Sequence, residues 1–179
     1  VRIASTLQAR HEMIELVMEN IPHFTENPEN RCYYCKKYIF EKLLFVAREF
    51  QLAWVCDGTN ADDMAETRPG MAALTELGIR SPLRECGLRK SEIRELSRGH
   101  VLAAANKPST PCLATRIPHN SIITEDKLRQ IEKAEGILRH LGIAQVRVRH
   151  HDTMARIETT EDQFSTVIKY RKDVLEAFH

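Results

Sequence analysis

Apolar side chains recur at helical spacing along most of the chain. The pattern is clearest at residues 35–50, where one apolar stripe runs beside a mostly charged face. Thr124 is expected to cap the start of a long helix, and Gly142 is expected to end it. The pattern predicts helices at residues 7–20, 35–50, 69–77, 88–96, 125–141 and 160–178.

Two other stretches have the pattern of strands. Residues 52–56 form an unbroken apolar run that stops at Asp57 and Gly58, which predicts a buried strand of a parallel sheet and therefore a buried Cys56. Residues 145–150 alternate strictly between apolar and polar, and they are expected to form a hairpin with residues 154–158. Ligands of parallel sheets bind beyond the carboxyl ends of the strands, so the loop that begins at Asp57 is a predicted site.

The order of these elements predicts two domains. We expect an α/β domain over residues 1–115 and a small α+β domain over residues 116–179. A net charge of +1 on 179 residues excludes a general attraction to nucleic acid. We find no apolar run of membrane-spanning length and no apolar signal core. Five cysteines, an odd number, favour reduced thiols in a cytoplasmic protein.

A proline-rich segment around Cys112 is the first candidate for chemistry. Prolines at 108, 111 and 118 make residues 108–118 a stiff loop, which orders a reactive atom at little entropic cost. Arg116 adds a positive charge near the thiol and so favours the reactive thiolate. The alternative is a surface loop whose cysteine is only a small apolar group.

Two further clusters could bind metal or nucleotide. Cys32 and Cys35 form a CxxC pair before a helix, which suits zinc, redox chemistry or an iron–sulfur ligand set, but no second pair completes a zinc site. The alternative is two structural thiols at the start of a helix. The acids after the strand at 52–56 could hold Mg²⁺ together with substrate phosphates. An ordinary turn followed by a capped helix is the alternative for that loop.

Three arginines form a candidate anion site. Arg147 and Arg149 share one face of the predicted strand, and Arg116 could lie across from them. Guanidinium groups match phosphate geometry, so we expect all three to converge on one phosphate between the two domains. A solvated outer face is the alternative.

Taken together, these motifs resemble the LarE family of ATP-dependent sulfur transferases in the PP-loop pyrophosphatase superfamily. The resemblance runs from about Cys32 to Glu158 and depends on the order of the pieces. They are Arg31–Lys36, Asp57–Asp63, Arg68–Gly70, Lys107–Ser109, Cys112–Pro118 and Gln145–His151. It implies a Rossmann-like, adenine nucleotide alpha hydrolase-like first domain, and we expect a homo-oligomer.

The chemistry implied by the resemblance is sulfur transfer in nickel-pincer nucleotide synthesis. ATP with Mg²⁺ adenylates a carboxylate of pyridinium-3,5-biscarboxylic acid mononucleotide, and a cysteine then gives up its sulfur. Cys112 matches the sacrificial cysteine and Glu135 a substrate-side acid. Phosphate or substrate binding is implied for Thr115, Arg116, Arg147 and Arg149, and nucleotide or Mg²⁺ binding for Asp57, Gly58, Asn60, Asp62, Asp63 and Glu66.

The sequence departs from the family at its beginning. The family opens with a strand and a Ser-Gly-Gly-x-Asp-Ser loop for pyrophosphate, whereas none of the seven glycines here are adjacent. The expected first domain is therefore incomplete at its N-terminus. Alternative functions are another PP-loop activity, such as tRNA thiolation or ATP-dependent amidation, and a non-enzymatic metal-binding module that uses Cys32 and Cys35.

Overall fold

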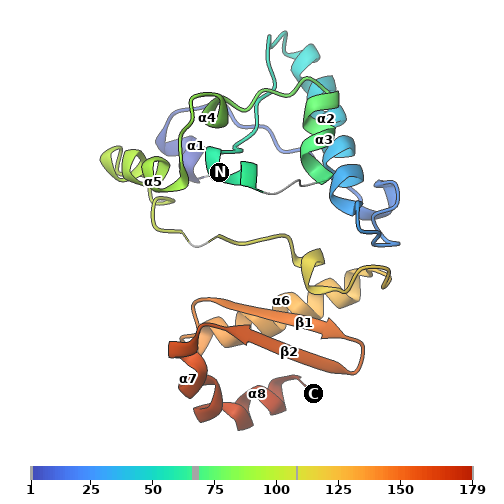
Figure 1. The fold of residues 1–179 in the computed structure, drawn as a ribbon, viewed down its shortest axis with the longest axis vertical. Helices are drawn as coiled ribbons and strands as arrows, with labels where there is room; N and C mark the ends of the chain where they lie inside the picture. The colour runs from blue at the N-terminus through green and yellow to red at the C-terminus, as the bar shows by residue number, and fades with distance from the viewer. Residues whose placement is uncertain (1, 66–68, 108, 179) are drawn as a thin grey trace. The chain divides into compact units, whose positions relative to one another are not determined.

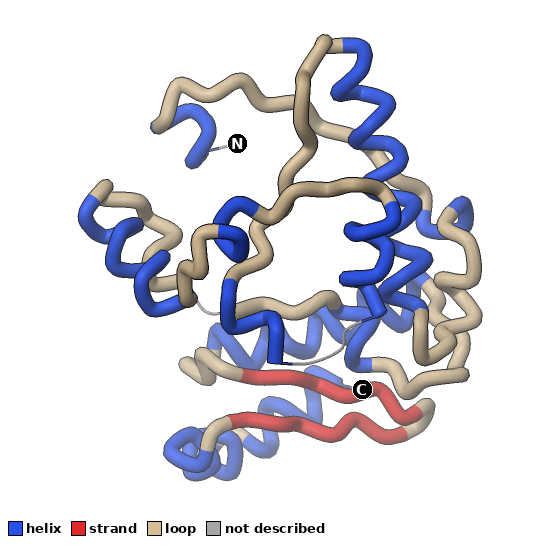
Figure 2. The backbone as a smooth tube through the Cα atoms, turned by 45° about the horizontal axis from the view of Figure 1, so that its top comes forward, coloured by secondary structure: helices blue, strands red, loops and turns tan. Residues whose placement is uncertain are grey.

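The structure is a computed structural model that describes residues 2–65, 69–107 and 109–178 (Figure 1). It is a mixed helix and sheet protein with a small antiparallel sheet of two strands, which lie side by side in Figure 2. In chain order the elements are α1 (Arg2–Thr6), η1 (Met18–Asn20), α2 (Arg31–Glu49), η2 (Ala61–Ala65), α3 (Pro69–Glu76), α4 (Pro82–Glu85), α5 (Lys90–Gly99), η3 (Leu113–Arg116), α6 (Glu125–His140), β1 (Val146–His151), β2 (Met154–Thr159), η4 (Glu161–Gln163), α7 (Phe164–Lys169) and α8 (Arg171–Phe178).

The chain packs as two compact units. The first comprises Val1–Phe24 and Asn30–Lys107, and the second comprises Thr25–Glu29 and Pro108–His179. The segment around Cys112 therefore belongs to the second unit, as do the three arginines of the candidate anion site.

In the first unit, α2 packs along α3, and both helices confirm the apolar periodicity. A Cβ atom on Gly70 would come within 2.9 Å of the Lys36 side chain, so glycine permits this close approach. Tyr33 and Lys37 on α2 each donate a hydrogen bond of 2.5 Å to Glu76 on α3. These contacts join the ends of two helices that are adjacent in space but separated in sequence.

The helix expected at residues 7–20 is wrong. The structure has only the short helices α1 and η1 in this part of the chain. Leu7 and Val17, two residues of its expected apolar stripe, are 56% and 51% exposed. A short helix gains most of its stability from packing its apolar face, and these residues lack that packing.

The buried strand expected at residues 52–56 is also wrong. Leu52 and Trp54 are 61% and 65% exposed, and Cys56 is exposed rather than buried. Among the described residues, the β-pairing of this segment is limited to one parallel bridge between Cys56 and Arg80. A parallel ladder needs a neighbour along the whole strand, and here only the end of the segment has one.

The second unit is built on the predicted hairpin. Strands β1 and β2 pair in antiparallel register, with Arg147 opposite Glu158 and Arg149 opposite Arg156. Val146 and Val148, on the other face of β1, form a core with residues of α6 and α8. The α6 helix confirms its prediction, because Thr124 accepts a hydrogen bond from the backbone N–H of Lys127 and Gly142 follows with a φ of 91°.

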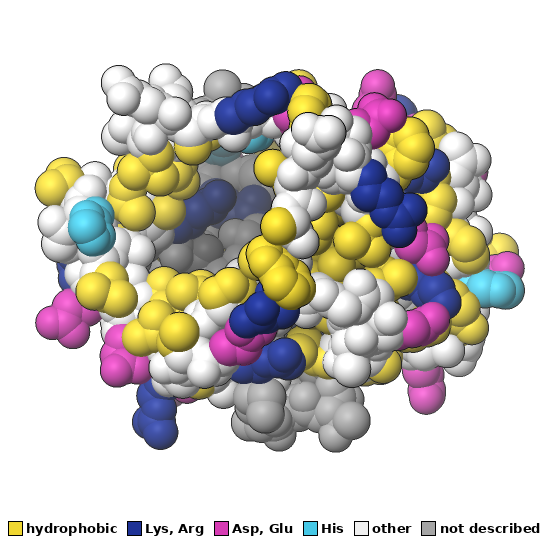
Figure 3. Space-filling view, turned by 90° about the horizontal axis from the view of Figure 1, so that it is seen from above, with side chains coloured by type: hydrophobic (Ala, Val, Ile, Leu, Met, Phe, Trp, Pro, Cys, Tyr) yellow, Lys and Arg dark blue, Asp and Glu magenta, His cyan; other side chains and the backbone are white. Residues whose placement is uncertain are grey.

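The last predicted helix is divided into η4, α7 and α8. The break at Tyr170 allows Val174 of α8 to enter the core, whereas Phe164 and Ile168 of α7 stay exposed. Among the described residues, we find no helix with both the length and the apolar character needed to cross a membrane. On the face drawn in Figure 3, basic and acidic side chains are interspersed among hydrophobic ones.

Candidate functional site

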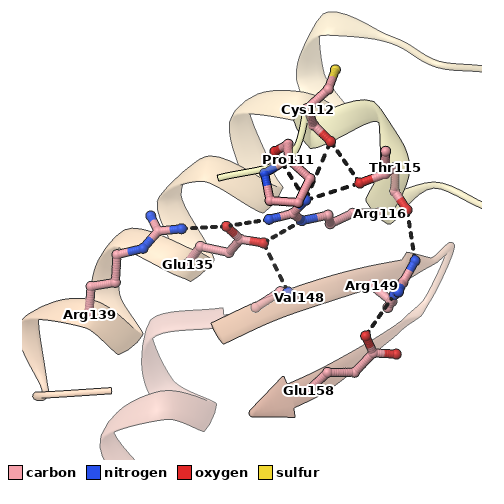
Figure 4. A network of polar contacts seen from close by, with 9 residues as sticks. All are labelled: Pro111, Cys112, Thr115, Arg116, Glu135, Arg139, Val148, Arg149 and Glu158. Atoms are coloured by element: carbon pink, nitrogen blue, oxygen red, sulfur yellow. Dashed lines mark hydrogen bonds and ion pairs between the residues drawn. The ribbon is translucent and has the colours of Figure 1, made fainter. Parts of the chain in front are cut away.

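Cys112 stands at the N-cap position of η3, and its side chain is exposed. Its carbonyl accepts hydrogen bonds from the backbone N–H and the hydroxyl of Thr115, at 3.0 and 2.7 Å. In Figure 4 the thiol points away from the ion pairs behind the loop. The backbone at this cysteine is therefore anchored while its sulfur atom stays accessible.

Arg116 anchors the backbone of the loop that carries Cys112. Its side chain is only 1% exposed, and every nitrogen of its guanidinium group donates to a protein acceptor. Nε and Nη2 donate to Glu135 at 2.7 and 3.2 Å, and Nη1 donates to the carbonyl of Pro111 and the hydroxyl of Thr115 at 3.2 and 3.0 Å. Glu135 thus compensates the charge of Arg116, which the sequence had suggested would act beside the thiol.

Glu135 is fully buried, and three groups donate to it. Besides Arg116, these are Arg139 at 2.6 Å and the backbone N–H of Val148 at 3.1 Å. Burial by itself would raise the pKa of Glu135. The hydrogen bonds from Arg116 and Val148 and the nearby arginine charges outweigh burial and hold the pKa below its usual value. The carboxylate is therefore ionised at neutral pH. It connects α6 and β1 to residues 108–118, which we call the cysteine loop.

Arg149 connects the hairpin to the same loop. Its guanidinium donates to Glu158 at 2.9 Å and to the carbonyl of Thr115 at 2.8 Å. Arg156 also pairs with Glu158, at 2.9 Å. Burial tends to raise the pKa of Glu158, but the hydrogen bonds and charges of Arg149 and Arg156 lower it overall. Sequence reasoning overlooked Glu158, although its place in the hairpin register could have indicated it.

Arg147 differs from the other two predicted arginines. Its side chain is exposed, and in the described part of the chain that side chain makes no hydrogen bond or ion pair. It lines a cavity of about 260 Å³ that is also bordered by Arg116 and Arg139. Arg149 does not line this cavity. The other lining residues are Ser109, Thr110, Pro111, Ala144, Gln145, Val146, Glu158, Thr159 and Thr160.

Asn27 secures the far end of the cysteine loop, although it lies some ninety residues earlier. Its side chain is fully buried and donates to the carbonyls of Pro118 and Ser121 at 2.7 and 3.1 Å. Its own carbonyl accepts a hydrogen bond from Asn120 at 2.8 Å. The sequence analysis did not single out this residue, and asparagine before Pro28 was its only local signal.

The acidic loop of the first unit is held together by its own hydrogen bonds. Asp57 accepts hydrogen bonds from the hydroxyls of Ser81, at 2.6 Å, and Thr59. Burial would raise the pKa of Asp57, and these hydrogen bonds reverse the effect and lower it. The backbone N–H groups of Asn60 and Lys90 donate to Asp63 and Asp62 at 3.2 and 2.8 Å.

This loop does not form a ready cation site in the described residues. We find no group of three or more His, Cys, Asp or Glu side chains placed to share a metal ion there or elsewhere in that part of the chain. Gly58 has open space on the side where a Cβ atom would lie. Glu66 lies outside the described residues.

The other cysteines lie in the first unit. Cys32 and Cys35 fall in the opening turns of α2, the first exposed and the second half-buried. Cys86 is exposed at the end of α4. Cys112 is thus distinguished by its anchored loop and its unit, and not by exposure alone.

These features define a mixed helix and sheet protein that presents an exposed cysteine beside an arginine-lined cavity. No family model matches the chain. It is 40% identical over 159 residues to the uncharacterized protein slr1717 of Synechocystis, across 89% of the chain and 59% of that relative. It is 33% identical over 172 residues to the uncharacterized protein MJ0830 of Methanocaldococcus jannaschii, across 96% of the chain and 67% of that relative. The chain belongs to the same protein family as MJ0830.

A third relative has a name that states an activity. The chain is 34% identical over 152 residues to the pyridinium-3,5-bisthiocarboxylic acid mononucleotide synthase of Lactiplantibacillus plantarum. The match covers 85% of the chain and 55% of that protein. Across these three relatives, the chain spans between 55% and 67% of their lengths.

Proposed function

We propose that the chain is part of an ATP-dependent sulfur transferase that makes a pyridinium thiocarboxylic acid mononucleotide, with Cys112 as the sulfur donor. The observation that carries the proposal is the exposed thiol on a loop held by the buried Arg116–Glu135 pair. The named synthase supplies the substrate class. We also propose that the first unit is a Rossmann-like PP-loop domain and that the enzyme works in the cytoplasm as a homo-oligomer.

The proposed reaction begins with activation of a substrate carboxylate by ATP, which forms an acyl adenylate and releases pyrophosphate. The thiolate of Cys112 attacks the acyl carbon and displaces AMP, so a thioester forms. Loss of the Cα proton of Cys112 then breaks its Cβ–S bond. Sulfur leaves as the thiocarboxylate of the product, and dehydroalanine remains in the protein.

The role of the Arg116–Glu135 pair in this proposal is to position the cysteine. Arg116 donates to the carbonyls of Pro111 and Cys112, at 3.2 and 3.4 Å, so it fixes the backbone on which the thiol is mounted. A nucleophile held in one orientation avoids the entropic cost of finding the reactive geometry. The side chain of Glu135 is buried, so this structure offers no surface of it to a substrate. The expected contact of Glu135 with substrate therefore stays a prediction.

ATP and Mg²⁺ are assigned to the loop at residues 57–63. Its carboxylates already accept hydrogen bonds within the first unit, which does not favour a resident cation. Mg²⁺ usually keeps several waters and binds through substrate phosphates with one or two carboxylates. Mg²⁺ would therefore arrive with ATP, and Asp62, which is exposed, is the candidate ligand in this loop.

The test is the intact mass of the protein, expressed from its complete open reading frame, after turnover with ATP, Mg²⁺ and substrate. Elimination of the sulfur should remove roughly 34 Da, localised to the peptide that contains Cys112. Cys112→Ser should form no thiocarboxylate. Cys86→Ser serves as the matched control, because it removes another exposed thiol, and it should react like the unchanged protein.

Two results would contradict the proposal. Thiocarboxylate formed without loss of mass would mean that the sulfur comes from elsewhere. Product formation by Cys112→Ser at the normal rate would remove this cysteine from the reaction.

A further inference from the structure

A larger cavity, of about 630 Å³, lies in the second unit beside its hydrophobic core. Its lining includes Val148 and Val174, which belong to that core. Met154 and Leu175 line it as well, and these two side chains are 60% and 61% exposed. Burial of apolar surface is favourable, so apolar groups of a partner would be stabilised in this cavity.

The charge left over at the cavity is positive. Its charged lining residues are Lys133 of α6 and Asp152 of the hairpin turn. Asp152 is already paired with Lys127 at 3.4 Å. The side chain of Lys133 makes no hydrogen bond or ion pair with any residue that the structure describes. A partner that fits this cavity therefore brings an acidic side chain next to apolar ones.

A surface with this character occurs on α7 of the same chain. Phe164 and Ile168, which share one helix face because they are four residues apart, are 52% and 64% exposed. Glu161 and Asp162 of η4 precede this helix, and within the described ranges their exposed side chains have no hydrogen bond or ion pair. We call these four residues the α7 surface. Val167 packs against the core, so the other face of α7 is already in use.

The α7 surface and the cavity lie at opposite ends of the hairpin. The strands pair Val146 with Thr159 at one end and His151 with Met154 at the other, about 17 Å away at the usual rise per residue. Helix α7 follows the Thr159 end, whereas Met154 lines the cavity. Figure 1 shows α7 and the hairpin turn at the two ends of the strands. The α7 surface is therefore placed to fill the cavity of another molecule and not its own.

We infer that the α7 surface of a second copy of this chain docks in this cavity, with its two acidic side chains beside Lys133. The inference deepens the proposed function and rests on it only for the expectation of a homo-oligomer. Two copies that lie side by side in opposite directions make the contact twice. Such an arrangement has the two-fold symmetry that is commonest among homo-oligomers.

Sedimentation velocity of the 179-residue chain, without ATP or substrate, tests the inference. The unchanged chain should form a dimer whose fraction rises with concentration. Ile168→Glu on the α7 surface and Leu175→Glu in the cavity should each weaken the dimer about tenfold or more, because each removes a large apolar side chain from the contact. Both side chains are exposed in the single chain, so neither substitution should unfold it.

Ile122→Glu is the matched control. Ile122 belongs to the same unit and is 63% exposed, close to the 64% of Ile168. It lies outside α7 and does not line the cavity. This variant makes the same chemical change at a comparable position, and it should dimerise like the unchanged chain.

Charge reversal tests which side chains meet across the contact. Lys133→Glu should weaken the dimer about twofold or more, and so should the paired change of Glu161→Lys and Asp162→Lys, as expected for exposed ion pairs. Combining the changes on both sides brings opposite charges together again. The combined variant should therefore recover most of the lost affinity.

Four results would overturn the inference. The first is a chain that stays monomeric at every concentration. The second is a small apolar molecule that native mass spectrometry finds bound to the monomer and that Leu175→Glu releases, because the cavity would then belong to that ligand. The third is equal weakening by Ile122→Glu, which would indicate unspecific apolar association. The fourth is a combined charge variant that recovers no affinity.

The contact and the sulfur transfer can fail separately. Association is measured as mass, so an inactive chain that dimerises as described leaves the contact standing. A monomeric chain whose Cys112 loses its sulfur leaves the proposed chemistry standing and removes only the homo-oligomer.

Discussion

Glu135 accepts hydrogen bonds from Arg116, Arg139 and the backbone of Val148 while its side chain is fully buried. A buried ion pair of this kind adds little net stability compared with apolar side chains, but removing one partner leaves an uncompensated charge. The pair is therefore better explained by where it places the cysteine loop than by the stability it adds.

Glu135→Gln should destabilise the second unit by about 3–5 kcal/mol, because the positive charge of Arg116 would remain buried without its partner. The measurement is native-state hydrogen exchange at the amides of α6 and β1, which reports the free energy of opening in that unit. Glu125→Gln removes an exposed carboxylate from the same helix, and its effect should stay within about 0.5 kcal/mol. Equal protection of these amides in the two variants would contradict the prediction.

The segment Thr25–Glu29 acts at the scale of an element, because it packs with the loop that follows η3. Backbone N–H groups of Asn120 and Ile123 donate to the carbonyls of Asn27 and Thr25, both at 2.8 Å. The Asn27 side chain also donates to the carbonyls of Pro118 and Ser121 in the same loop. A short piece from the first part of the sequence thus completes the unit that contains Cys112.

Asn27→Ala should lower the free energy of unfolding of the second unit by at least about 1–3 kcal/mol, because buried carbonyls would lose their donor. Asn27 also has a φ of 58°, a conformation that asparagine adopts more readily than alanine. Chemical denaturation followed by amide exchange in residues 117–123 measures the effect.

Asn30→Ala is the control for that experiment. Asn30 is exposed at the N-cap of α2, and its side chain makes no capping hydrogen bond. The control should leave the exchange of residues 117–123 unchanged. A loss of protection in the control as large as in Asn27→Ala would refute the anchoring role.

Acid sensitivity belongs to the whole molecule, because carboxylates with lowered pKa values occur in both units. They include Asp57 in the first unit and Glu135 and Glu158 in the second, with ordinary values of 3.8, 4.5 and 4.5. A group whose pKa is lower in the folded state binds fewer protons there than when unfolded. The stability it contributes is complete above the ordinary pKa and is lost as the pH falls below it.

We therefore expect the melting temperature to change little between pH 7 and about pH 5 and then to fall as the pH drops through 4 towards 3. Glu135→Gln should show a shallower fall, because one of the titrating groups is gone. Thermal denaturation across this range, at constant ionic strength, is the measurement. A parallel decline in the variant and the unchanged protein would exclude Glu135 as a contributor.

The sequence alone predicted correctly those elements whose packing partners lie nearby in the chain. Helix α6 has its own cap and stop residues, and strand β1 turns directly into β2, so periodicity and register were confirmed together. The apolar residues at 7–20 and 52–56 met no such partner, and both predictions failed. Periodicity shows which face can be buried, but only the neighbouring elements decide whether it is.

At the candidate site, the residue types were evident from the sequence and their roles were not. Cysteine between prolines, with arginines on an alternating strand, pointed to this part of the chain. Tertiary packing then separated the arginines, since Arg116 is buried on Glu135, Arg149 pairs with Glu158, and Arg147 faces a cavity. Charge partners far apart in sequence meet only after folding, so no local pattern distinguishes an arginine that holds a loop from one that can hold a phosphate.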